Sequence, residues 1–158
     1  MSLLIAALSV RTYSAGVAFN TAAMQDSHDQ RRILYLASLG AGHEYDAAIL
    51  MQREARLRSR ELQVSGAWLF DGHRICTFVS GASTAIDAWL QAVRADSRNV
   101  LNALLCDGRS ESCRGTVSWE VGYCEPDDLD AFDGEKGLRG DAALAAFNQL
   151  MAQCDMRT

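Results

Sequence analysis

Residues 62–80 read LQVSGAWLFDGHRICTFVS and carry the strongest structural signal in the chain. Between 62 and 70, the even-numbered side chains point one way and the odd-numbered side chains the other, as on a β-strand. The dipeptide Asp71-Gly72 follows at once, and D-G between two apolar runs is typical of a tight β-hairpin. We therefore expect a strand over 62–70 that pairs with a return strand over 74–80.

The residues before this hairpin predict a strand and a helix. Residues 32–38 form a short apolar run of strand length, closed by the glycine-containing loop 39–42. Residues 44–59 contain no Gly or Pro and are rich in strong helix formers. A helix over 44–59 would carry one apolar stripe, made of Ala48, Met51 and Ala55.

The residues after the hairpin predict a second helix and two further strands. Ser83 is suited to cap a helix that runs to about residue 94. The core face of that helix has the expected spacing and consists of Ile86, Trp89, Leu90 and Val93. We expect a fourth strand over 100–106, ended by Asp107-Gly108, and a fifth over 117–123.

The last part of the chain combines an acidic stretch with a helix. Residues 125–135 hold six carboxylates and no basic residue. A helix from about residue 141 has one apolar stripe, made of Leu144, Phe147, Leu150, Met151 and Cys154. The predicted order is therefore β-α-β-β-α-β-β followed by a helix, an α+β fold with a ferredoxin-like sheet. We expect two helices on one face of this sheet and the C-terminal helix on the other.

Length and composition limit the classes of function. The 158 residues predict an N-terminal extension (1–31), one domain (32–124), and an acidic linker with the C-terminal helix (125–158). A net charge of -5 argues against a nucleic-acid partner. The apolar run near the N-terminus is far shorter than a membrane span. The five cysteines form no C-x-x-C pair and have no zinc-ligand spacing, which favours reduced thiols in a cytoplasmic protein.

Several short motifs occur in a recognisable order and spacing. They are RILY at 32–35, VSG at 64–66, DG at 71–72, FVSG at 78–81, DSRN at 96–99, and Arg114, Trp119 and GY at 122–123. Together they resemble a BLUF domain, the family that senses blue light using FAD, over residues 32–123. In that family the flavin ring lies between the two helices. A Tyr and a Gln form the light-driven switch, an Asn holds the flavin's polar edge, and a Trp and a Met lie on the last strand.

The resemblance implies an FAD site and also shows where this chain departs from it. The matching positions are Tyr35 for the Tyr, Thr77 for the Gln, Ser59 for the Asn, Trp119 for the Trp and Val121 for the Met, with Asp96 and Arg98 from the DSRN motif. A hydroxyl cannot offer the donors and acceptor of an amide. The family's photocycle is therefore expected to be absent or altered here. Each position also has a structural interpretation: core aromatics at Tyr35 and Trp119, a strand residue at Thr77, and a turn pair at Asp96 and Arg98.

Three functions remain to be compared. The first is an FAD-binding blue-light sensor that acts on a separate partner protein, or on a second copy of the chain, through the C-terminal helix or a sheet edge. The second is a flavin-free interaction or regulatory module, which bulky side chains between the helices would favour. The third is a small hydrolase on a ferredoxin-like scaffold, but the sequence has no glycine-rich anion loop, paired carboxylates or Cys–His pair for it. We therefore expect a non-enzyme, and of the first two functions the resemblance favours the FAD-binding sensor with weak or altered photochemistry.

Three arginines on the first predicted helix allow two interpretations. Arg53, Arg56 and Arg60 share one side of the helix at i, i+3 and i+7. They form either a solvated helix face or a binding site for the phosphates of FAD. If they form a solvated helix face, the three arginines bind no ligand.

Overall fold

The computed structural model describes residues 29–42, 45–110 and 117–156, and the predicted extension up to residue 28 and Arg114 lie outside these ranges. In chain order the elements are β1 (Gln30–Leu39), α2 (Tyr45–Leu62), β2 (Ser65–Phe70), β3 (Arg74–Ala82), α3 (Ser83–Ala95), β4 (Asn99–Arg109), β5 (Trp119–Tyr123), α4 (Pro126–Leu129), the 3-10 turn η1 (Asp130–Phe132), α5 (Gly140–Gln153) and β6 (Asp155–Met156). The predicted α+β fold and its order of elements are confirmed.

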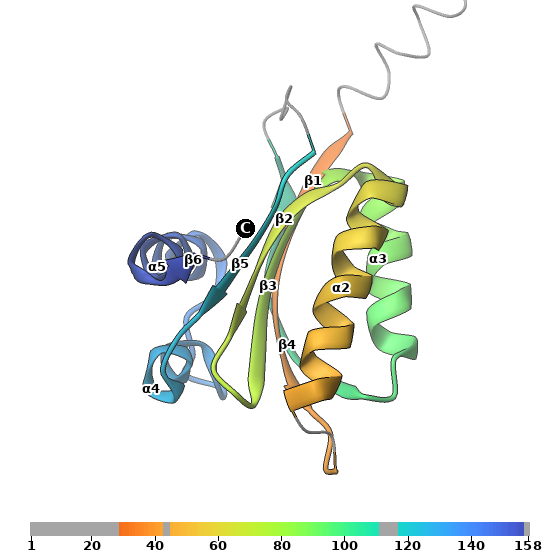
Figure 1. Cartoon of the computed structure of the whole chain (residues 1–158). Coiled ribbons are helices and arrows are strands. Elements are labelled where there is room, and N and C mark those ends of the chain that lie inside the picture. The colour runs from red at the N-terminus through yellow and green to blue at the C-terminus, as the bar shows by residue number, and fades with distance from the viewer. Residues whose placement is uncertain (1–28, 43–44, 111–116, 157–158) are drawn as a thin grey trace, which may run out of the picture.

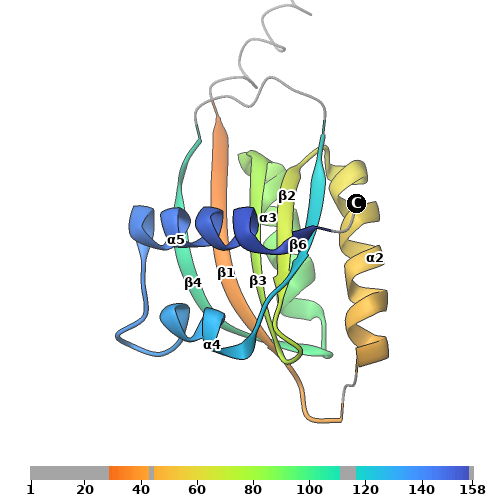
Figure 2. The ribbon, with the colours of Figure 1, turned by 60° about the vertical axis from the view of Figure 1, so that its left-hand side comes forward.

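The strands form one mixed sheet in the order β4-β1-β3-β2-β5-β6. The predicted hairpin is confirmed, because β2 and β3 pair antiparallel from Ser65 opposite Ser80 to Phe70 opposite Ile75. β1 pairs antiparallel with β3 and with β4, whereas β5 runs parallel to β2. Helices α2 and α3 lie on one face of this sheet (Figure 1). On the opposite face, α5 runs across the strands with α4 beside it (Figure 2).

The alternation along the central strands explains why both faces are covered. On β2, Trp68 and Phe70 pack with residues of α2, while Leu69 packs with residues of α5. β1 behaves in the same way, since Tyr35 belongs to the cluster under α3 and Leu36 to the cluster under α5. A strand that is apolar on both faces needs a cover on each side.

The first helix is longer than predicted. α2 extends to Leu62, so β2 begins at Ser65 rather than at residue 62. Gln63 ends the helix with a left-handed backbone (φ 54°), and the N–H of Val64 donates to the carbonyl of Ser59 at 2.9 Å. This is the geometry of a helix C-cap, which residues other than Gly adopt less often. The alternating pattern that predicted the strand already begins at residue 62, so the sequence did not show where the helix ends.

Three other predicted boundaries are wrong for identifiable reasons. β1 begins at Gln30, two residues before the predicted start of the first strand. Ser83 is not the cap of α3, because Ala82 occupies that position and makes no side-chain cap bond. Asp107-Gly108 does not end β4, which continues to Arg109. There, Arg31 of β1 donates to both carboxylate oxygens of Asp107 at 2.7 Å and holds the two strands together.

The acidic stretch is partly helical rather than a simple linker. α4 begins with a capping box in which Glu125 and Asp128 each bond the other's backbone N–H. Leu129 and Phe132 are fully buried in the cluster under α5. These two apolar side chains give the stretch a reason to fold against the sheet.

Arg74 binds the acidic stretch to the β2–β3 hairpin. Its guanidinium lies 2.9 Å from Asp71 Oδ2, 2.8 Å from Asp130 Oδ1 and 3.1 Å from Asp133 Oδ2, and it donates to the carbonyl of Pro126 at 2.6 Å. The Arg74 side chain is 11% exposed and that of Asp71 1%. Asp130 and Asp133 pair with Arg74 while their side chains remain 65% and 49% exposed, so the acidic run also stays in contact with solvent.

Replacing Arg74 by glutamine tests this connection. Arg74→Gln leaves the buried Asp71 carboxylate without its cation, and we expect the free energy of unfolding to fall by about 3 kcal/mol. Urea unfolding followed by circular dichroism measures the loss. Asp141→Asn is the control, because Asp141 is 94% exposed and its pair with Arg32 spans 3.3 Å. Its expected effect is below about 1 kcal/mol, and equal losses in both variants would contradict the assignment.

Candidate functional site

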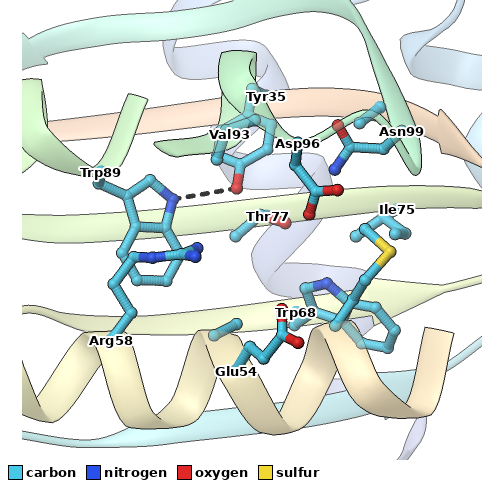
Figure 3. Close-up of a pocket in the computed structure, with 13 residues that line it drawn as sticks. Tyr35, Glu54, Arg58, Trp68, Ile75, Thr77, Trp89, Val93, Asp96 and Asn99 are labelled. Atoms are coloured by element: carbon cyan, nitrogen blue, oxygen red, sulfur yellow. Dashed lines mark hydrogen bonds between the residues drawn. The ribbon is translucent and has the colours of Figure 1, made fainter. Parts of the chain in front are cut away.

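A slot between α2, α3 and the sheet brings together three of the predicted site residues. Tyr35 on β1 and Thr77 on β3 are direct partners in the strand register. Both line the slot together with Asp96, which follows α3 (Figure 3). Glu54 and Arg58 line it from α2, so the slot is bounded by both helices and by the sheet.

Trp89 of α3 forms one wall of this slot. Its indole Nε1 donates to the Tyr35 hydroxyl at 3.0 Å, as Figure 3 shows, and Trp89 and Tyr35 are 1% and 4% exposed. The Arg58 guanidinium lies over the ring of Trp89, 5.5 Å from its centroid. Trp119 packs against the same ring with centroids 5.3 Å apart. These contacts hold the indole in one position.

The space left in the slot is small. The cavity has a volume of about 30 Å³. A water molecule needs roughly 10–15 Å³ of such space, whereas sites for drug-sized ligands measure roughly 300–1,000 Å³. The slot in this arrangement therefore accommodates water and does not fit a flavin ring.

The polar atoms that face the slot are only partly satisfied. Burial raises the pKa of Tyr35 above its ordinary value, and the N–H of Trp89 opposes this effect by stabilising the phenolate. Thr77 Oγ1 faces the Tyr35 hydroxyl but is buried without a hydrogen bond of good geometry to any described residue. Asn99 Oδ1 is in the same situation. A water molecule in the cavity would satisfy such atoms.

Arg98 lies behind the slot rather than in it. It donates to Asp96 at 2.8 and 2.9 Å and also binds Glu54 of α2. Hydrogen bonds from this guanidinium hold the pKa of both Asp96 and Glu54 below their ordinary values. Both carboxylates are therefore charged at neutral pH. Asp96 and Arg98 form the predicted turn pair, and the pair also links α2 to the segment that enters β4.

Ser59 and Trp119 are not in the slot, although the resemblance grouped them with Tyr35 and Thr77. They line a second cavity of about 200 Å³ together with Arg56, Arg60 and Val117. The Ser59 hydroxyl donates to the carbonyl of Arg56 at 2.8 Å, within its own helix. The six predicted site residues are thus divided between the slot, the segment behind it and a neighbouring cavity.

The sequence predicted Trp89 only as a core residue of its helix and not as a residue that lines the slot. One signal could have found it: a buried tryptophan usually needs an acceptor for its N–H. Tyr35 is the polar aromatic on the strand that this helix covers. In the described part of the chain, no group of three His, Cys, Asp or Glu side chains is arranged to hold a metal ion. None of the described helices has the length and apolar character to cross a bilayer.

No protein-family model matches the chain, and no curated protein matches it either. Solved structures do. The photo-activated state of BlsA superposes with a TM-score of 0.61 and 15% identity, over 77% of this chain and 94% of BlsA. The dark state of BlrB, a BLUF protein, gives 0.54 and 16%, over 80% of this chain and 98% of BlrB.

A longer protein shows the same likeness. Klebsiella pneumoniae BlrP1 with FMN and cyclic diGMP superposes with a TM-score of 0.51 and 16% identity, over 76% of this chain. The matched region covers 30% of that BlrP1 chain. At these identities the likeness shows the fold, and the chain has the fold of BLUF domains.

The buried hydroxyl of Tyr35 predicts a loss of stability at high pH. The folded state keeps this proton above pH 10, near which an unfolded tyrosine loses it, so the free energy of unfolding falls as pH rises past about 10. Tyr35→Phe removes this part of the slope. It also leaves the N–H of Trp89 unpaired and lowers stability at neutral pH by about 1–3 kcal/mol.

Urea unfolding between pH 8 and 11 measures both effects. Tyr45→Phe is the matched control, because Tyr45 is exposed on α2. A slope that flattens equally in both variants would show that Tyr35 is not its source.

Proposed function

We propose that this chain is a BLUF-fold interaction or regulatory module that works without flavin in its inter-helix slot. The observation that carries the proposal is the indole of Trp89, which lies in the slot with its N–H on the Tyr35 hydroxyl. The remaining cavity of about 30 Å³ is too small for a flavin ring. The fold then serves as a scaffold whose activity depends on its surface.

The residues at the two amide positions support the same proposal. Thr77 offers one short hydroxyl, and Ser59 uses its hydroxyl on a carbonyl of α2. Neither presents a donor and an acceptor side by side. In this proposal the two positions that match the family's Asn and Gln supply no amide to a flavin.

A partner protein is expected to bind the outer face of α2. The apolar stripe of α5, which the sequence suggested for this contact, is buried against the sheet at Leu144, Phe147 and Met151. The sheet edges are also poorly suited, because the pairing of β4 is interrupted by two register shifts and β6 has two residues. By contrast, α2 exposes four large apolar side chains, Tyr45, Ile49, Leu50 and Leu57. Exposed apolar side chains of this kind favour protein contacts.

The second candidate is an FAD-binding blue-light sensor with weak or altered photochemistry. It is supported by the fold shared with BLUF proteins, by Tyr35 and Trp119 at two family positions, and by the unpartnered hydroxyl of Thr77. This function requires the indole of Trp89 to leave the slot. It would therefore break the bond to Tyr35 and the contact with Arg58.

The absorption spectrum of the purified protein separates the two candidates. We expect no flavin band near ~450 nm, where the chromophore itself absorbs, and no quenching of flavin fluorescence when FAD is added. Trp89→Ala opens the slot, so this variant is expected to bind FAD measurably. Ile86→Ala is the control for lost packing, since Ile86 is buried on α3 but does not line the slot. A yellow wild-type protein would support the sensor instead.

A further set of variants tests the two substituted positions. With Trp89→Ala as background, Thr77→Gln together with Ser59→Asn should bind FAD at least ~tenfold more tightly, because an amide at residue 77 faces the slot and the longer amide at residue 59 can reach toward it from the neighbouring cavity. Illumination should then produce a small red shift of the flavin band. Fluorescence titration and difference spectra measure these effects. Equal affinities with and without the two amides would show that these positions do not face the flavin.

A further inference from the structure

Two cysteines that lie far apart in the sequence, Cys124 and Cys154, line the same cavity. Cys124 directly follows β5, and Cys154 directly follows α5, which leads into β6 beside β5 (Figure 2). Both are half-buried thiols, and the cavity between them is open and measures about 450 Å³. Neither cysteine lines the slot beside Tyr35. The proposed function therefore gives these two thiols no role.

The strand register sets the two cysteines opposite each other. β5 and β6 pair antiparallel, with Tyr123 opposite Asp155. One further step in this register brings Cys124 opposite Cys154, and side chains at opposite positions point to the same face of a sheet. Gly122 shares that face with Cys124, and a Cβ built on Gly122 would lie 3.5 Å from Cys154 Cβ. The two thiols therefore lie on one face of the sheet, side by side.

The backbone hydrogen bonds show which kind of strand pair the two cysteines form. The N–H of Cys124 donates to the carbonyl of Phe70 at 3.0 Å, and the N–H of Cys154 donates to the carbonyl of Leu150 at 2.9 Å. Neither amide bonds to the opposite cysteine, so the two residues are a non-hydrogen-bonded pair. The Cα atoms of such a pair lie about 4.5 Å apart, and a disulfide needs roughly 4.4–6.8 Å. The backbone is thus already placed for a disulfide.

The other described cysteines lie too far away to compete for Cys124. Cys76 belongs to β3, and β2 separates β3 from β5. Two strand spacings amount to roughly 9.5 Å, beyond the ~7 Å over which two Cα atoms can be bridged. Cys106 lies on β4, at the opposite edge of the sheet from β6. Within the described residues, the geometry therefore favours one pairing.

We propose that Cys124 and Cys154 form a reversible disulfide that joins the end of α5 to β5. The oxidant is a small disulfide such as oxidised glutathione. The Cys154 thiolate, its proton lost to solvent, attacks one sulfur of the oxidant and releases one glutathione thiolate. Cys124 Sγ then attacks Cys154 Sγ and gives its proton to the released thiolate, while the second glutathione leaves and takes a proton from solvent. Two protein thiols become one disulfide, and one glutathione disulfide becomes two thiols.

The burial of Cys124 accounts for this order of steps. Burial, followed by the proximity of Cys154, raises the pKa of the Cys124 thiol to about 12. Cys124 therefore stays protonated at neutral pH and reacts poorly with a dissolved oxidant. Once Cys154 carries the glutathione, the second attack is intramolecular, and its high effective concentration offsets the small fraction of thiolate. The proposal does not depend on the absence of flavin from the slot.

Peptide mapping of the full chain tests the pairing. The reduced protein is treated with oxidised glutathione, the remaining thiols are blocked with N-ethylmaleimide, and the chain is cleaved with trypsin. Cleavage after Lys and Arg places the five cysteines on five peptides, with Cys124 on 115–136 and Cys154 on 140–157. We expect mass spectrometry to find these two peptides joined, at the sum of their masses less two hydrogens. A second sample, oxidised in urea, is the control for pairing that does not require the fold.

Three results of this mapping would overturn the proposal. The first is that both peptides carry maleimide or glutathione instead of being joined. The second is that another pair of cysteines predominates. The third is that the chain oxidised in urea gives the same yield of the joined peptides, because the fold would then not direct the pairing.

Urea unfolding of variants gives an independent measurement. The disulfide closes a loop that contains α4, η1 and α5, and this closure restricts the unfolded chain. We expect oxidation to raise the urea midpoint of the wild type by about 1 M or more, and dithiothreitol to reverse the rise. Cys124→Ser should abolish the rise. Cys106→Ser, which replaces a half-buried cysteine of β4, is the matched control and should keep it. A rise that persists in Cys124→Ser, or that is lost in Cys106→Ser, would contradict the pairing.

Discussion

The sheet imposes the main constraint on this molecule, because its central strands are apolar on both faces and each face must be covered. β1 and β2 direct alternate side chains to opposite sides, so Tyr35 and Trp68 require one cover and Leu36 and Leu69 another. Helices α2 and α3 provide the first cover, and α5 with the α4–η1 segment provides the second (Figures 1 and 2). The second cover comes from residues far along the chain, and Arg74 binds its acidic part to the hairpin.

The first cover leaves a slot beside Tyr35. The side chains that line this slot, rather than the fold itself, decide which ligand it can hold. Proteins with this fold include BLUF photoreceptors, but a shared fold does not supply a shared site. In this chain the indole of Trp89 lines the slot, held by Tyr35, Arg58 and Trp119, and the cavity that remains is small. The same indole packs against the ring of Trp119, and Trp119 also lines the neighbouring cavity. The slot and the cavity are therefore joined by two tryptophans whose rings pack at a tilt of 38°, so a change on one side alters the packing on the other.

Local signals predicted elements well and their ends less well. The hairpin was predictable because Asp71 bonds to the backbone N–H of His73 and Arg74, a contact that depends on three residues alone. The end of β4 was not predictable, because Asp107 is held in the sheet by Arg31, 76 residues away. The folding of the acidic stretch against the hairpin was not predictable for the same reason, because Asp130 and Asp133 pair with Arg74, which lies 56 and 59 residues away, while they stay exposed to solvent.

The order of the elements, the apolar faces of each strand and helix, and the positions that match the BLUF motifs were all determined by the sequence, because periodicity and short spacings are local properties of a chain. The grouping of the site residues was decided only by the tertiary structure. Tyr35, Thr77 and Asp96 meet in the slot, while Ser59 and Trp119 line another cavity. Helix packing sets the distances between the site residues. A side chain as large as that of Trp89 takes up space between the two helices and the sheet, and so decides which residues can contact one another.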